Sequence, residues 1–85
     1  MTRDQADILA QAFRNGFEAQ VDVETVHDRG RYRFAVVSPR FRGMTHLERQ
    51  DALWQLADKT LPRDVTIDVS LILAFAPEEL AAAGS

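Results

Sequence analysis

Residues 1–16 have the pattern of an amphipathic helix. Their apolar residues recur at helical spacing, at Ile8, Leu9, Ala12 and Phe13. Thr2 followed by Gln5 has the composition of a capping box, in which each side chain bonds a backbone N–H of the other residue. We expect the helix to end at Asn15 and Gly16, because glycine readily adopts the left-handed conformation that commonly follows a helix.

The pattern then changes to strict alternation, which predicts a strand with one buried face and one acidic, exposed face. The apolar set is Phe17, Ala19, Val21 and Val23, and the polar set is Glu18, Gln20, Asp22 and Glu24. A turn at residues 27–30 leads into a second strand over residues 32–37, so the two strands should form a hairpin. Arg31 and Arg33 then lie opposite the acidic face, where opposite charges help to fix the register. Pro39 ends the second strand because it has no N–H to donate.

The second half of the chain predicts a helix, a strand and a short terminal helix. Thr45 with Glu48 forms another capping box, and the helix that follows should run to Pro62. Its apolar stripe is Leu47, Leu53, Trp54, Leu56, Ala57 and Leu61. A third strand is expected over residues 65–75, with a buried side formed by Val65, Ile67, Val69, Leu71, Leu73 and Phe75. Pro77 and the two glutamates after it have the composition of a helical first turn.

The opposite side of the third strand is less polar than a solvent-exposed face should be. It carries Ser70, Ile72 and Ala74. We expect the terminal helix to cover this side, and a second subunit of a weak homodimer is the alternative to a monomer covered in this way.

The order of elements is therefore α-β-β-α-β-α, an α+β fold in a single domain over residues 1–85. The hairpin makes the first two strands antiparallel, and the helical crossover makes the second and third strands parallel. A three-stranded mixed sheet with its helices on one face is the expected architecture.

Composition removes several classes of function. The 85 residues include no cysteine and only two histidines, so thiol chemistry, disulfides and thiolate metal ligands are absent. The sequence shows no signal peptide and no apolar run of about 20 residues, so we expect a cytoplasmic protein without membrane insertion. There is no nucleophile–base pair, phosphate-binding glycine loop or metal triad, and we therefore expect no enzymatic activity.

Charge leaves a nucleic-acid hypothesis open. The net charge is −3, but five arginines fall within fourteen positions and form a possible basic edge: Arg29, Arg31, Arg33, Arg40 and Arg42. Such an edge would bind phosphates with a steep dependence on salt. Solvent exposure and pairing with the acidic strand is the simpler interpretation.

The joint between the second strand and the second helix, SPRFRGMTHLERQD (residues 38–51), is the candidate site. Gly43 allows a sharp turn, and Phe41 is expected to pack beneath the helix. The polar residues that remain are Arg40, Arg42, His46, Arg49, Gln50 and Asp51. His46 and Gln50 are four residues apart and share a helix face, and the helix N-terminus beside two arginines could receive an anion such as phosphate.

The same stretch resembles the BolA-like proteins. Their pattern is V-S-x-x-F-x-G followed by R-H-R, and the matching residues here are Val37, Ser38, Arg40, Phe41, Gly43 and Arg49. The segment TIDVSLILAFAPEEL is similar to the family's I-H-A-L-S-L-x-x-x-x-P-E-E. The resemblance covers nearly the whole chain and implies a variant of the type II KH fold, with the same order of elements.

The resemblance implies a non-catalytic function. BolA-like proteins pair with monothiol glutaredoxins, share a [2Fe–2S] cluster with them in iron–sulfur trafficking, and in some bacteria regulate transcription in the stress response. The family's ligand is the histidine of R-H-R, and that position is Gln50 here. An amide oxygen is a poor ligand for such a cluster, so no cofactor is expected. His27 and His46 are the weak candidates to replace the missing histidine.

Three hypotheses follow. The first is an adaptor that docks a protein partner through residues 40–43 and the N-terminal end of the next helix, without metal. The second is a KH-like domain that binds nucleic acid through the basic edge, although it lacks a G-x-x-G loop. The third is a glutaredoxin-linked cluster partner that uses His46 or His27.

Overall fold

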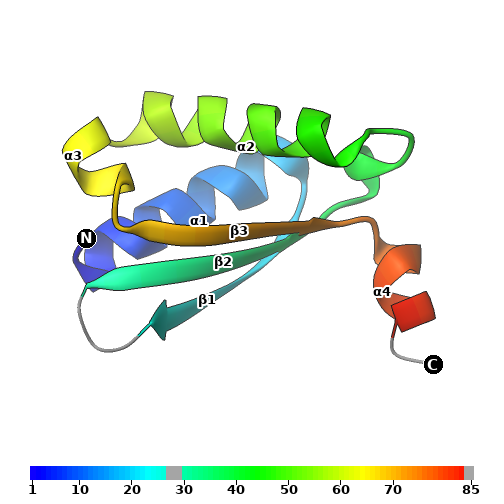
Figure 1. Cartoon of the computed structure of the whole chain (residues 1–85), viewed down its shortest axis with the longest axis horizontal. Coiled ribbons are helices and arrows are strands. Elements are labelled where there is room, and N and C mark those ends of the chain that lie inside the picture. The colour runs from blue at the N-terminus through cyan, green and yellow to red at the C-terminus, as the bar shows by residue number, and fades with distance from the viewer. Residues whose placement is uncertain (27–29, 84–85) are drawn as a thin grey trace.

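The protein is described here by a computed structural model, which covers residues 1–26 and 30–83. Its elements in chain order are α1 (Arg3–Phe17), β1 (Gln20–Val26), β2 (Arg31–Val37), the 3-10 turn η1 (Pro39–Phe41), α2 (His46–Thr60), α3 (Arg63–Thr66), β3 (Val69–Phe75) and α4 (Pro77–Ala83). The sheet has the order β1-β2-β3, with β1 and β2 antiparallel and β2 and β3 parallel. The helices α1 and α2 lie on one face of the sheet, and α4 lies beyond the end of β3 (Figure 1). The predicted α+β fold with a three-stranded mixed sheet is confirmed.

The core lies between the sheet and the two long helices. Phe13 of α1 meets Phe34 of β2 edge-on, with ring centroids 5.8 Å apart, and both side chains are fully buried. Both predicted capping boxes are present, at Thr2 with Gln5 and at Thr45 with Glu48.

The end of α1 differs from the prediction. The helix continues through Gly16 to Phe17, and Glu18 takes the left-handed conformation, with φ of 51°. A Cβ atom at Gly16 would lie 2.8 Å from a terminal methyl of Leu56, which is too close for ordinary contact. A larger residue here would require the end of the Leu56 side chain to move, so glycine allows the close approach of α1 to α2. The expected first strand begins at Gln20 rather than Phe17.

The hairpin follows the expected register. Asp22 pairs with Ala35 and Glu24 pairs with Arg33 across β1 and β2. Glu24 and Arg33 also form an ion pair, which confirms the predicted attraction between the acidic and basic positions. Residues 27–29 of the expected turn lie outside the described residues.

The third strand was predicted wrongly in two respects. Residues 63–66 form the short helix α3, in which the N–H groups of Val65 and Thr66 bond the carbonyl of Pro62, so the strand begins only at Val69. The register with β2 then shifts, because Tyr32 pairs with Val69 but the next residue of β2 pairs with Leu71. Ser70 is thus an extra residue, and it reverses the face on which every later side chain lies.

The reversal places the less hydrophobic set of β3 in the core. Ile72 and Ala74 are 1% and 4% exposed and belong to the same buried cluster as Phe13 and Phe34. The other set is Leu71, Leu73 and Phe75, on the face away from the long helices. The expectation that α4 or a second subunit covers Ile72 and Ala74 was therefore wrong, since the helical layer already covers them.

Side chains from the helices bond the backbone of both edge strands. Arg14 of α1 donates to the carbonyl oxygen of Val21 in β1 at 3.0 Å. At the other edge Gln50 donates to the carbonyl of Ile72 in β3 at 2.8 Å. These bonds occupy acceptors that an edge strand otherwise offers to other chains.

No helix within the described residues is long and apolar enough to cross a membrane.

Candidate functional site

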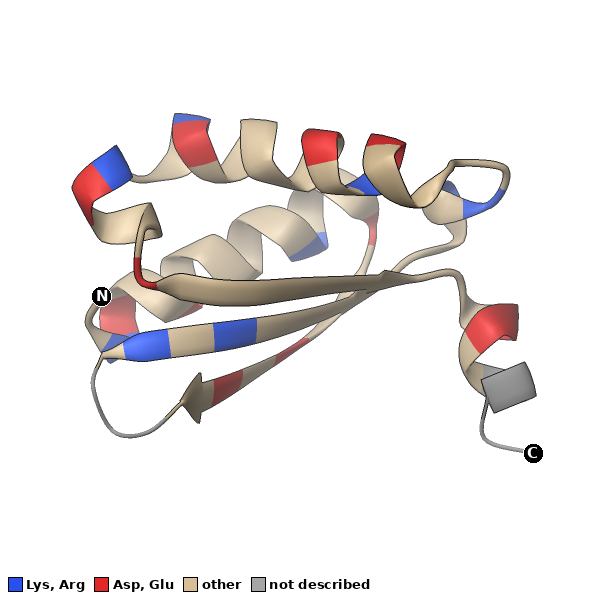
Figure 2. Ribbon diagram, in the orientation of Figure 1, with Lys and Arg blue, Asp and Glu red and all other residues tan. Residues whose placement is uncertain are grey.

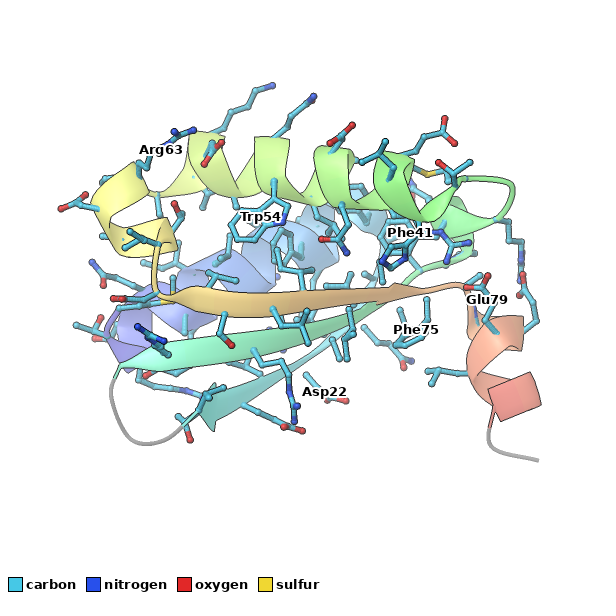
Figure 3. All side chains as sticks on the ribbon, viewed as in Figure 1. Asp22, Phe41, Trp54, Arg63, Phe75 and Glu79 are labelled. Carbon is cyan, nitrogen blue, oxygen red and sulfur yellow. The ribbon has the colours of Figure 1, made fainter. Side chains whose placement is uncertain are left out.

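The candidate site lies at the N-terminal end of α2, where η1, the loop after it and the start of α4 meet. Figure 3 shows Phe41 and Glu79 at this end of the molecule. The helix α4 begins more than 30 residues after the start of α2, so the site depends on the complete fold.

Phe41 anchors the site from below. Its side chain is fully buried, and its ring lies 5.4 Å from that of Phe17 and 5.8 Å from the guanidinium carbon of Arg49. The hydroxyl of Ser38 accepts a bond from the backbone N–H of Arg40 at 3.1 Å and donates to the carbonyl of Phe17. The sequence placed Phe41 both beneath the helix and among the partner-binding residues; the structure places it in the core, where it positions its neighbours.

The turn into α2 requires a glycine. Gly43 has φ of 76°, a conformation that costs other residues about 1 kcal/mol or more. Thr45 then accepts from the N–H of Glu48, and the Glu48 carboxylate accepts from the N–H of Thr45 at 2.7 Å. That backbone bond lowers the pKa of Glu48. The protein's own carboxylate therefore occupies the helix N-terminus, which leaves less reason to expect a bound phosphate there.

Two ion pairs join the site to α4, and we call Arg42, Arg49, Glu78 and Glu79 the α4 clasp. Arg42 Nε lies 2.8 Å and 3.0 Å from the two carboxylate oxygens of Glu78. Arg49 makes a bidentate pair with Glu79, at 2.7 Å and 3.0 Å. The Arg49 pair has the strong geometry of two parallel bonds between a guanidinium and a carboxylate, whereas Arg42 uses one N–H for both oxygens.

Arg49 is the more deeply placed arginine of the clasp, with only 10% of its side chain exposed. It also donates to the carbonyls of Met44 and Ala74, at 3.2 Å each. Its hydrogen bonds, with one from the N–H of Ala76, lower the pKa of Glu79 to about 2. The pKa of Arg49 is raised in turn by the Glu79 carboxylate. Arg49 therefore fixes the start of α2 against both β3 and α4.

The expected basic edge is largely neutralised. Arg33 pairs with Glu24, Arg40 with Glu18 at 2.7 Å and Arg42 with Glu78. Figure 2 shows the positive positions of β2 beside the negative positions of β1. Arg31 is exposed on β2, and Arg29 lies outside the described residues. A nucleic-acid phosphate would have to compete with carboxylates that already hold these arginines.

The three positions considered for cluster binding differ in their surroundings. Gln50 is half-buried, and its amide nitrogen is committed to the carbonyl of Ile72. His46, one turn earlier, is exposed, whereas His27 lies outside the described residues. Among the residues that the structure covers, no three His, Cys, Asp or Glu side chains are grouped as a metal site would require. Gln50 does not fit a cluster ligand, and His46 could contribute one imidazole at most.

Leu47 is the residue that the sequence reasoning missed. It was assigned to the apolar stripe of α2, yet its exposed fraction is 71%. The buried residues of the helix are Arg49, Leu53 and Ala57, at successive intervals of four. Leu47 lies six positions before Leu53, about 120° away around a helix with 100° per residue, and this offset was the available signal. The apolar side chain of Leu47 therefore lies in solvent, next in sequence to His46.

A second feature lies at the other end of α2. An open hollow of about 500 Å³ is lined by Trp54, Asp58, Arg63, Thr66, Ile67 and Val69. None of these residues was a sequence-predicted site residue. Ile67, which was expected inside the third strand, is 76% exposed here because it follows α3.

Comparison with known proteins identifies the fold. No family model matches the sequence, and no curated protein matches it significantly. Among solved structures, BolA1 from Arabidopsis thaliana is similar with a TM-score of 0.69 and 16% identity, over 92% of this chain and 98% of that one. The BolA domain of SufE1 from Arabidopsis thaliana gives 0.68 and 18%, over 93% and 98%.

A bacterial structure shows the same likeness. A BolA protein homologue from Coxiella burnetii has a TM-score of 0.61 and 18% identity, over 95% of this chain and 97% of that one. The chain therefore has a BolA-like fold over nearly its whole length. Identities this low show the fold alone.

Proposed function

We propose that the chain is a non-catalytic, BolA-like adaptor that docks a protein partner through the first turn of α2 and the loop before it. The docking surface is defined by Arg40, Arg42, Gly43, His46 and Leu47. Binding at this surface needs no metal ion. Gln50 forms a hydrogen bond to the sheet and does not serve as a metal ligand.

The exposed Leu47 carries the proposal. An apolar side chain that is 71% exposed loses the stabilisation of burial, and a partner that covers it would recover about 1.5–3 kcal/mol. Its backbone is held by the capping box at Thr45, and the next turn is held by Arg49 through the α4 clasp. A docking residue on such an ordered support loses little conformational entropy on binding.

A monothiol glutaredoxin is the first partner to test, because the family resemblance implies it. The same resemblance implies a shared cluster, but the ligand position is Gln50, whose amide is bonded to the carbonyl of Ile72. Binding of the cluster-free glutaredoxin is therefore the expected mode. The transcriptional alternative is weaker, because three of the four described arginines of the basic edge, Arg33, Arg40 and Arg42, are paired with carboxylates.

The test is a calorimetric titration of this protein with a cluster-free monothiol glutaredoxin. Leu47→Lys should weaken binding at least about tenfold, as expected when an apolar contact is replaced by a charge that must be desolvated. Ile67→Lys is the matched control, because Ile67 is equally exposed at the other end of α2. It should bind as the wild type does.

Two results would contradict the proposal. Equal affinity of wild type and Leu47→Lys would remove Leu47 from the interface. Absence of binding by the folded wild type at high micromolar concentration would remove the glutaredoxin as partner. Thermal melting of each variant checks that folding is unchanged.

A further inference from the structure

The face of the sheet away from α1 and α2 is divided into a polar half and an apolar half. The apolar half consists of Ala35 and Val37 on β2 with Leu71, Leu73 and Phe75 on β3. The polar half consists of Gln20, Asp22 and Glu24 on β1 with Arg31 and Arg33 on β2. Figure 3 shows Asp22 and Phe75 on the side of the sheet away from the long helices.

The apolar half is open to solvent. Leu71 is 44% exposed, and Leu73 and Phe75 are half-buried. The α4 clasp holds the start of α4 at the end of β3, beside α2. In Figure 1 this helix extends beyond the strand instead of lying along the open face.

The dimensions of the apolar half match one helix. Two strands about 4.8 Å apart present a strip roughly 10 Å wide, and a helix with its side chains is about 10–12 Å across. The four steps from Leu71 to Phe75 span about 13 Å, the length of roughly nine helical residues. Sheets are commonly covered by helices, and both edges of this sheet already accept bonds from its own side chains.

Charge then selects the partner. Asp22, Ala35 and Leu73 form one row across the three strands, so an acidic side chain borders the apolar strip. Glu24 is paired with Arg33, and Asp22 faces Ala35 instead. Arg31 and Arg33 lie toward the Leu71 end of this face, whereas Asp22 lies beside the row of Leu73. A helix on the strip would therefore be favoured by one lysine or arginine placed above Asp22.

A second copy of this chain fits the face poorly. A two-fold axis across the strands would lay each β1 on its equivalent and bring the two Asp22 carboxylates together. An axis parallel to the strands would separate the acids, but each β1 would then lie beyond the edge of the other copy, and Asp22 would meet no basic residue. A different chain can supply that basic residue, and a second copy cannot.

We propose that the open face of the sheet docks one amphipathic helix of a protein partner, with an apolar stripe against Leu71, Leu73 and Phe75 and a basic flank over Asp22. This surface and Leu47 lie on opposite sides of the sheet, so the inference does not rest on the proposed function. Together the two surfaces would allow the protein to bridge two partners.

The test uses two synthetic helical peptides of about 18 residues, a length that approaches stable helicity. Both carry the same leucine stripe, and one has a lysine at the position above Asp22 where the other has a glutamate. Titration of the isotope-labelled protein, followed by amide chemical shifts, should show the lysine peptide bound about tenfold more tightly. The shifts should be largest along β3 and around Asp22.

Variants make the test specific. Asp22→Lys should reverse the preference between the peptides, and Leu71→Lys should weaken binding of both. Ile8→Lys replaces a residue on α1 that is 53% exposed and should leave binding unchanged. Shifts elsewhere, an unchanged preference in Asp22→Lys, or no binding at millimolar peptide would overturn the proposal. So would a concentration-dependent dimer of the wild type that Leu71→Lys abolishes, because the occupant would then be a second copy.

Discussion

Both faces of β3 carry apolar side chains, and the two faces differ in what covers them. Ile72 and Ala74 are packed in the core, whereas Leu71 on the opposite face is 44% exposed. The difference arises from one extra residue, Ser70, which reverses the strand after Val69. When both faces of a strand are apolar, the sequence alone therefore does not predict which face is buried. The register with the neighbouring strand decides it. The packed face contributes stability, and the open face is available for a partner.

The largest expected difference in stability is between truncating a residue on the packed face of β3 and truncating one on its open face. Ile72→Ala removes a side chain that is 1% exposed and should destabilise the protein by about 2–5 kcal/mol, through lost burial and a cavity. Leu71→Ala should cost less than about 1 kcal/mol, as is usual for a surface residue. Chemical denaturation of both variants measures the two losses, and equal losses would contradict the assignment of faces.

Loss of the Arg49 contacts at the outer edge of β3 should have an intermediate effect on stability. Arg49→Gln removes the bonds to the carbonyl of Ala74 and to Glu79, and a loss of about 2–3 kcal/mol is expected for charge-assisted bonds of a largely buried group. Arg42→Gln is the matched control in the same α4 clasp, because the pair of Arg42 with Glu78 is more than half exposed. It should cost clearly less in the same denaturation measurement. A larger loss for Arg42→Gln would mean that Arg49 does not anchor the strand.

The pH dependence should be the smallest effect. The folded pKa of Glu79 is about 2, below its ordinary value of 4.5, so the pair with Arg49 stabilises the protein above pH 4.5. This contribution is lost as the pH falls from about 4.5 to 2. The decline in stability over that range should be shallower in Glu79→Gln, as measured by denaturation at several pH values. Identical declines would show that Glu79 titrates normally in the folded protein.

Local patterns predicted much of the fold. The capping boxes at Thr2 and Thr45, the hairpin pairing of Glu24 with Arg33 and the burial of Phe41 all depend on residues close in sequence or on simple alternation. These elements gave the α-β-β-α-β-α order. Because a helix connects β2 and β3, the two strands were expected to be parallel, and they are.

The errors occurred where distant contacts decide the local structure. Gly16 lies inside the helix, close to the Leu56 side chain of α2, although glycine alone signals a helix end. The extra residue at Ser70 depends on pairing with β2, and apolar residues on both faces of β3 gave no warning of it. The ion pair of Arg42 with Glu78 joins residues 36 apart. Local sequence patterns could therefore not predict that this arginine of the basic edge is paired.

The central claim is that Leu47 and its neighbours are a protein-docking surface that works without metal. Titration of isotope-labelled protein with cluster-free monothiol glutaredoxin, monitored by amide chemical shifts, tests it most directly. We predict shifts concentrated over residues 40–48. Shifts confined to the open sheet face or to the hollow beside Trp54, or no shifts at all, would contradict the claim.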